Sequence, residues 1–120
     1  MNLPSAVFSV RFKNGNPKFL SVSLLSEIVR NGYSVELLAK GQSMIPTLPA
    51  ESRIRVAPLT SLPAEGEILL YLSGNRLIGH RMKQLVTGRN LVIFKGDNCL
   101  YSDVPVNPAC ILGRIITQNA

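Results

Sequence analysis

Two different periodicities of apolar residues divide the chain. The first covers residues 21–33, where apolar residues recur at the spacing of one helix face. Those residues are Leu24, Leu25, Ile28 and Val29. Ser21 or Ser23 can cap the start of a helix here, and Asn31-Gly32 supplies a stop. The pattern predicts one amphipathic helix of about three turns.

The segment before this helix has the pattern of a strand. Residues 7–12 alternate apolar and polar side chains as an edge strand does. Residues 14–17, Asn-Gly-Asn-Pro, follow it and predict a turn. We therefore expect residues 1–33 to form an N-terminal strand and helix that pack on a core made by the rest of the chain.

After residue 33 the pattern changes to short β segments. They are rich in branched and aliphatic residues, and clusters of Pro, Gly, Asn and Asp separate them. The predicted strands are residues 35–40, 53–58, 66–73, 76–86, 90–96 and 111–118. Turn signals at a spacing of about ten residues favour a small barrel or a folded, coiled β-sheet. We expect a mainly β protein in which residues 34–120 form the β domain and the whole chain is one structural domain.

The composition excludes several classes of protein. Of the 120 residues, 46% are hydrophobic and 17% are charged, as in an ordinary globular domain rather than a disordered tail. The net charge is +6, but the lysines and arginines are scattered and form no run. We interpret this charge as a solvated surface and expect no nucleic-acid partner.

Nothing in the sequence has the pattern of a targeting or membrane segment. The first residues lack the basic, apolar and small-residue regions of a signal peptide, and no window approaches the roughly 18 apolar residues of a spanning helix. Cys99 and Cys110 have neither CxxC spacing nor a histidine cluster beside them. We expect reduced structural thiols in a cytoplasmic protein that has no transmembrane anchor, metal or cofactor.

The first candidate for chemistry is the turn GQSMIPTLP, residues 41–49. Gly41 permits an unusual backbone angle, and Pro46 and Pro49 stiffen the chain after Ser43. A serine at such a turn can present its hydroxyl and its backbone N–H to a substrate carbonyl. Taken alone, this pattern is more often an ordinary turn.

Two further segments carry titratable groups. In a strand, His80 shares one face with Met82, while Arg81 and Lys83 share the other face. A lone histidine in a strand is more often structural than catalytic. Asp97 and Asp103 flank a loop that follows another strand, which is also an ordinary turn composition. The hypothesis of a catalytic site therefore depends on whether these segments occur together in a known pattern.

Together they resemble the signal peptidase I and LexA superfamily of serine peptidases. The string GQSMIPTL, residues 41–48, resembles the G-x-S-M-x-P-T-L motif around the nucleophile of type I signal peptidases. Four later segments resemble further blocks of the same domain in the same order: residues 66–68 (GEI), 79–81 (GHR), 95–98 (KGDN) and 111–115 (ILGRI). The resemblance covers about residues 35 to 118.

The match also selects a subtype. Bacterial signal peptidases and LexA-type repressors carry lysine before the arginine of the third block, whereas the endoplasmic-reticulum and archaeal type carries histidine, as His80 does here. In that type an aspartate six residues beyond the K-G-D-N aspartate completes a Ser-His-Asp arrangement, which implies Asp103. Asp97 is the alternative third member or a support for the loop. Lys83 is the alternative base, although its strand phase opposes that of His80.

The resemblance implies a serine endopeptidase with Ser43 as nucleophile, and the departures from it shape the expected function. Gly41 stands where many signal peptidases have a serine, so the oxyanion donors are expected from the backbone of the loop that holds Gly41 and Met44. An amphipathic helix stands where membrane-bound relatives have an anchor. We expect an anchorless peptidase that cuts an extended peptide, such as a leader or precursor peptide. The alternative is a LexA-type regulatory or non-catalytic peptide-binding domain.

Overall fold

The computed structural model describes residues 2–3, 7–11, 17–74 and 76–117 of the chain. Within these ranges the chain is mainly β, with one α-helix, α1 (Val22–Arg30), and one short 3₁₀ turn, η1 (Pro108–Cys110). The strands are β1 (Asn2–Leu3), β2 (Val7–Arg11), β3 (Pro17–Ser21), β4 (Val35–Lys40), β5 (Glu51–Pro58), β6 (Ile68–Ser73), β7 (Arg76–Val86), β8 (Leu91–Lys95) and β9 (Ile111–Thr117). The prediction of a mainly β chain with a helix near its start is confirmed.

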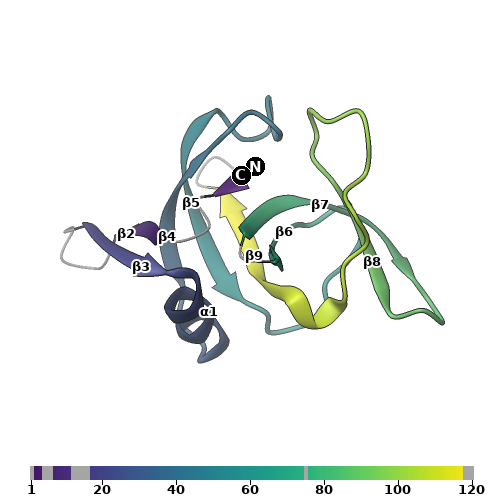
Figure 1. The fold of residues 1–120 in the computed structure, drawn as a ribbon, viewed down its shortest axis with the longest axis horizontal. Helices are drawn as coiled ribbons and strands as arrows, with labels where there is room; N and C mark the ends of the chain where they lie inside the picture. The colour runs from purple at the N-terminus through teal and green to yellow at the C-terminus, as the bar shows by residue number, and fades with distance from the viewer. Residues whose placement is uncertain (1, 4–6, 12–16, 75, 118–120) are drawn as a thin grey trace.

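The described strands pair in an antiparallel manner, and six of them close into a ring. The order around this ring is β1, β7, β6, β9, β5 and β4, and β1 closes it by pairing with both β7 and β4. The hairpin of β2 and β3 extends the sheet from β4, and β8 extends it from β7 (Figure 1). The loop from β4 to β5 and the loop that follows β8 project on the same side of the ring, at the top of Figure 1.

The helix begins and ends where capping residues satisfy its backbone. The hydroxyl of Ser21 accepts a hydrogen bond from the N–H of Leu24 at 3.2 Å, and the N–H of Asn31 closes the last turn on Glu27. Gly32 follows with a φ of +97°, which glycine adopts without strain. The apolar face packs on the sheet through buried Leu25 and Val29 and partly buried Ile28. Leu24, which the sequence assigned to this face, is exposed.

Two groups of buried side chains make up the core. The first combines residues of the helix, of the loop between β4 and β5 and of five strands: Leu25, Val29, Val35, Leu37, Ala39, Met44, Leu48, Ile54, Val56, Leu70, Leu77, Leu112 and Ile115. The second lies on the other face of β6 and β7: Leu69, Tyr71, Met82, Val92, Phe94, Val106 and Ile111. Successive residues of a strand point to opposite faces, so Leu70 joins the first group while Leu69 and Tyr71 join the second.

The N-terminal part differs from the sequence prediction. β2 lies between β3 and β4, so it is not an edge strand. Pro17, expected in a turn, begins β3, which pairs with β2 over its whole length. Pairing between strands is a tertiary property that local residue patterns do not encode. Residues 12 and 14–16 of the predicted strand and turn lie outside the described residues.

The helix is nine residues long. Nowhere in the described ranges is there a helix with the length and apolar character needed to cross a membrane.

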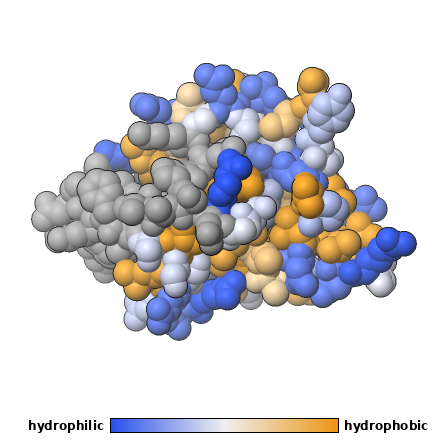
Figure 2. Space-filling model, in the orientation of Figure 1, coloured by the Kyte–Doolittle hydropathy of each residue, from blue (hydrophilic) through white to orange (hydrophobic). Residues whose placement is uncertain are grey.

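One face of the molecule shows how hydrophilic and hydrophobic residues are mixed on the surface. On the face in Figure 2, strongly hydrophilic groups lie apart from one another, with hydrophobic groups between them.

Candidate active site

Ser43 lies in the loop of residues 41–50, which joins β4 to β5. Gly41 at the start of this loop has a φ of +109°, in the region that glycine adopts most readily. The side chains of Met44 and Leu48 are buried in the core, and the N–H of Leu48 donates to the carbonyl of Met44 at 2.8 Å. The loop is therefore anchored through the residue after Ser43, while Ser43 itself stays partly exposed.

His80 lies in the middle of β7, and it is 4% exposed. It stands opposite Leu69 of β6 and shares its face of the strand with buried Met82. Its Nε2 atom lies 3.0 Å from the Oγ atom of Ser43. Lys83, the alternative base, is exposed, so the residue that the structure brings to Ser43 is His80.

Asp103 completes a chain of hydrogen bonds on the far side of the imidazole ring. Its backbone N–H donates to the carbonyl of Phe94 at 2.8 Å, which holds the loop against β8. Its Oδ2 atom lies 2.5 Å from Nδ1 of His80. The hydroxyl of Tyr71, in β6, donates to the same oxygen at 2.5 Å. Ser43, His80, Asp103 and Tyr71 thus form one connected polar network.

The charge state of this network follows from its surroundings. Burial raises the pKa of Asp103, but the hydrogen bonds from His80 and Tyr71 outweigh it and leave that pKa below its ordinary value. Burial and the hydrogen bond to Asp103 raise the pKa of Tyr71. Asp103 is therefore a carboxylate at neutral pH and Tyr71 a neutral donor. With Asp103 accepting from Nδ1–H, the neutral ring of His80 has Nε2 free to accept a proton.

Asp97 has a different set of partners. Arg81 donates to both of its carboxylate oxygens, at 2.8 and 2.7 Å, and the hydroxyl of Thr47 donates to Oδ2 at 2.6 Å. The hydrogen bonds from Arg81 lower the pKa of Asp97 to about 2, against the opposing effect of burial, and the Thr47 bond lowers it further. Arg81 follows His80 in β7, so its side chain points to the opposite face. Asp97 therefore supports the loop, and the structure brings Asp103, not Asp97, to the imidazole ring.

The two loops that carry Ser43 and Asp97 are joined by their backbones. The N–H of Asn98 donates to the carbonyl of Ser43 at 2.8 Å, and its side-chain amide donates to the carbonyl of Gln42 at 3.0 Å. The N–H of Asp97 lies 3.3 Å from the sulfur of Met44. These contacts fix the position of Ser43 relative to β7 and β8.

Gly96 allows this close approach. A Cβ atom at this position would lie 2.6 Å from the sulfur of Cys99, 2.7 Å from the carbonyl oxygen of Ser43 and 3.1 Å from Nε2 of His80. No side chain fits in that space without moving the Ser43 backbone.

Cys99 and Cys110 are free thiols in the structure, and Cys99 lies beside the candidate site.

The backbone N–H groups of Ser43 and Met44 belong to the serine turn and lie beside the candidate nucleophile. Within the part of the chain that the structure describes, the N–H groups of Ser43 and Met44 donate to no acceptor. Free N–H donors beside a nucleophile are what an oxyanion hole requires.

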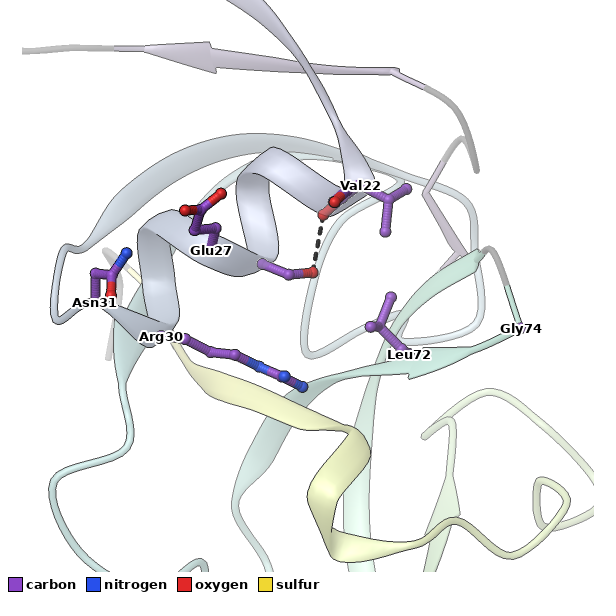
Figure 3. A pocket seen from close by; sticks show the side chains of 8 residues that line it. Val22, Glu27, Arg30, Asn31, Leu72 and Gly74 are labelled. Atoms are coloured by element: carbon purple, nitrogen blue, oxygen red, sulfur yellow. Dashed lines mark hydrogen bonds between the residues drawn. The ribbon is translucent and has the colours of Figure 1, made fainter.

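Two concavities lie away from this network. One, of about 540 Å³, lies beside α1 and is lined by Val22, Ser23, Ser26, Glu27, Arg30, Asn31, Leu72 and Gly74. Figure 3 shows its lining side chains on the helix and on the end of β6, and Arg30 donates to the carbonyl of Ala109 at 3.0 Å. The other, of about 370 Å³, includes Thr47 and Arg81 and lies on the opposite face of β7 from His80. Neither contains a nucleophile paired with a base.

The described residues were also compared with the arrangements of side chains that bind metal ions. Among them, no three His, Cys, Asp or Glu side chains gather closely enough to hold a metal ion. The polar network around Ser43 consists of hydrogen bonds between side chains and has a single carboxylate in contact with the histidine ring.

Sequence reasoning singled out Ser43, His80, Asp103, Asp97, Gly41 and Met44, and it assigned no role to four of their neighbours. These are Tyr71, Thr47, Asn98 and Gly96. Tyr71 could have been suspected, because a tyrosine in a buried strand needs a partner for its hydroxyl. The roles of the other three depend on how two distant loops meet, which no local pattern reveals.

Comparison of the chain with protein-family models, with curated proteins and with solved structures finds no match. The fold and the site together define a mainly β protein whose ring of strands carries a Ser-His-Asp chain of hydrogen bonds. Assignment of a function therefore rests on the geometry of these residues and on the motifs in the sequence.

Proposed function

We propose that this chain is a serine endopeptidase in which Ser43 is the nucleophile, His80 the general base and Asp103 the residue that orients the imidazole ring. The observation that carries the proposal is the continuous path from Ser43 Oγ to His80 Nε2, at 3.0 Å, and from His80 Nδ1 to Asp103 Oδ2, at 2.5 Å. Both distances are those of hydrogen bonds, as a nucleophile, its base and an orienting carboxylate require.

Acylation begins with proton transfer within this path. As the oxygen of Ser43 bonds to the carbonyl carbon of a peptide, Nε2 of His80 takes the hydroxyl proton. The carboxylate of Asp103 stabilises the imidazolium that forms. His80 then gives the same proton to the leaving amine when the C–N bond breaks, and an ester remains on Ser43. Water, deprotonated by His80, hydrolyses the ester and restores the serine.

The free N–H groups of the serine turn supply the oxyanion hole in this mechanism. The N–H groups of Ser43 and Met44 are without an acceptor in the described structure, so they can donate to the oxygen that becomes negative in the tetrahedral intermediate. Gly41 carries no hydroxyl that could contribute, which leaves the backbone as the source of donors. Met44 holds the turn in place through its buried side chain.

We also propose that the ring of strands is the coiled β domain of the signal peptidase I and LexA superfamily, in its Ser-His form. The motifs at residues 41–48, 79–81 and 95–98 support this assignment, because the residues that they bring together are the ones that the superfamily uses. The proposed substrate is an extended leader or precursor peptide. A cytoplasmic setting is part of the proposal, and the two free thiols support it.

Cleavage of a peptide library by the purified chain tests the proposal. Mass spectrometry of the products identifies any cleaved bond, and the best substrate then serves for kinetics. Ser43→Ala is expected to lower kcat by about three powers of ten or more, as loss of a nucleophile does. Ser34→Ala, an exposed serine before β4, is the matched control and should keep full activity.

The outcome separates the two classes of function. Cleavage that persists in Ser43→Ala would contradict the proposal. Peptides that bind with the same affinity to the wild type and to Ser43→Ala, with no cleavage by either, would favour a non-catalytic peptide-binding domain.

A further inference from the structure

The strand β1 occupies a position beside the candidate catalytic residues. It lies between β4 and β7, with Asn2 opposite Lys40 of β4 and opposite Ile78 of β7. Lys40 comes three residues before Ser43, and Ile78 comes two residues before His80. β1 therefore lies between the two strands that lead to the nucleophile and to the base.

The direction of β1 brings its start toward the site. β1 runs antiparallel to β7, with Leu3 opposite Leu77 and Asn2 opposite Ile78. From Leu3 to Asn2, toward the N-terminus, the paired residue of β7 changes from Leu77 to Ile78 and so comes nearer to His80. An extended peptide bound between β4 and β7 would need the backbone hydrogen-bonding groups that β1 uses in this structure.

Over the described residues, the pairing of β1 with its neighbours is short. Among the described residues, β1 is opposite β7 over Asn2–Leu3, whereas β6 is opposite β7 over Ile68–Ser73. The two described residues of β1 give up few hydrogen bonds when they leave the sheet. The two strands that flank it are each held by a second partner, β5 for β4 and β6 for β7. β1 can therefore leave while its neighbours stay paired.

We propose that β1 is a displaceable strand that occupies the peptide-binding position between β4 and β7 and competes there with the substrate. When β1 leaves this position, an extended substrate peptide takes its place and adds to β4 and β7 by main-chain hydrogen bonds. A tethered segment acts at an effective concentration of about millimolar, so it weakens the binding of a free peptide without touching the catalytic residues. The effect on cleavage rests on the proposed peptidase function, whereas the exchange of strands does not.

Two variants test the competition. The first chain begins at Ala6 and so lacks Asn2 and Leu3. The second is full length and carries Asn2→Pro with Leu3→Pro, because proline has no N–H to donate to a neighbouring strand. Its matched control, Asn2→Ala with Leu3→Ala, keeps both N–H groups. For the best library peptide, both test variants should show a KM about tenfold lower with kcat unchanged, and the control should match the wild type.

Addition of the missing segment completes the experiment. A synthetic peptide of residues 1–6, with a fluorophore at its C-terminus, should bind the shortened chain and raise the KM for the substrate, whereas a scrambled peptide should do neither. Binding of this peptide with no cleavage by any variant would support the exchange of strands and overturn the peptidase proposal. If the full-length proline variant keeps the wild-type KM, or if the shortened chain folds and fails to bind the peptide, β1 is a structural strand and the inference is wrong.

Discussion

Tyr71 donates its hydroxyl to Oδ2 of Asp103 at 2.5 Å, and this is the same oxygen that binds the ring of His80. Tyr71 belongs to β6, which pairs directly with the strand of the histidine, and its ring stacks on Phe94 with centroids 4.3 Å apart. The packing of the core thereby fixes the carboxylate, and the carboxylate fixes the imidazole ring. Tyr71 is a positioning residue, because it acts on the candidate base through Asp103.

Tyr71→Phe is expected to lower kcat by roughly tenfold, because it removes one hydrogen bond to a charged group and keeps the ring. Loss of this donor raises the pKa of Asp103, since a hydrogen bond to a carboxylate stabilises its ionised form. In a plot of kcat against pH, the acidic limb, where kcat falls as the pH is lowered, should therefore move to higher pH. Measurement of kcat and KM from pH 4 to 9 checks this, and a purely structural role would leave the limb in place.

His80→Ala is expected to cost several powers of ten in kcat, because Ser43 then lacks its base. His80→Lys is a sharper test. A lysine acts as a base only when its surroundings lower its pKa far from about 10.4, and the carboxylate of Asp103 favours the charged ammonium instead. We expect this variant to be nearly inactive at pH 7 and to recover partly at higher pH, more so with Asp103→Asn.

Lys83→Ala is the control for this pair. Its side chain is exposed, so this variant should retain the wild-type kcat. Full activity of His80→Ala together with an inactive Lys83→Ala would transfer the role of base to Lys83.

The ion pair of Asp97 and Arg81 should make stability depend on acidic pH. The pKa of Asp97 is lowered to about 2 in the folded chain, from roughly 3.9 in an unfolded one. A lowered folded-state pKa adds stability that is fully present above pH 4 and is lost as the pH falls through about 2. Because the pair is partly exposed, we expect a contribution of about 1 to 2 kcal/mol.

Urea unfolding of the wild type and of Asp97→Asn at several values from pH 2 to 7 measures this contribution. The difference in unfolding free energy should shrink toward pH 2. Glu65→Gln, at an exposed carboxylate, is the matched control and should change little at any pH. A difference between wild type and Asp97→Asn that stays constant down to pH 2 would contradict the assignment.

Gly96→Ala should damage both stability and activity. The added methyl group meets the carbonyl oxygen of Ser43 at 2.7 Å, which is backbone and cannot swing away. We expect a loss of roughly 1 to 3 kcal/mol in unfolding free energy and a large fall in kcat. Gly88→Ala is the control: its φ of +86° makes alanine costly, but nothing lies within 4 Å. It should lose stability while it keeps the wild-type kcat.

The β segments after residue 33 were predictable because each carries a local pattern. The predicted strands 35–40 and 76–86 coincide with β4 and β7, where branched residues run between Pro, Gly, Ser and Asn signals. β1 and β3 were not predicted. β1 has two residues, and β3 has five and begins with a proline, so neither carries enough of a strand pattern. What makes them strands is pairing with distant segments, which sequence alone does not display.

The candidate site was predictable only in part, for the same reason. Motif resemblance selected Ser43, His80 and Asp103, and the structure brings those three together. The separate partners of Asp97 and Asp103 follow from the alternation of side chains along β7, which puts His80 and Arg81 on opposite faces. The position of Tyr71 beside the other site residues depends on the register between β6 and β7, which a single sequence leaves open.

The three members of the polar path come from segments separated by 37 and 23 residues in the chain. Contacts of this kind require long loops to close before they can be made. In an unfolded chain Ser43 is a serine of ordinary reactivity, since the imidazole of His80 is not held near it to take its proton. The approach of these three side chains is therefore a property of the folded chain, and any reactivity that it gives to Ser43 is lost on unfolding.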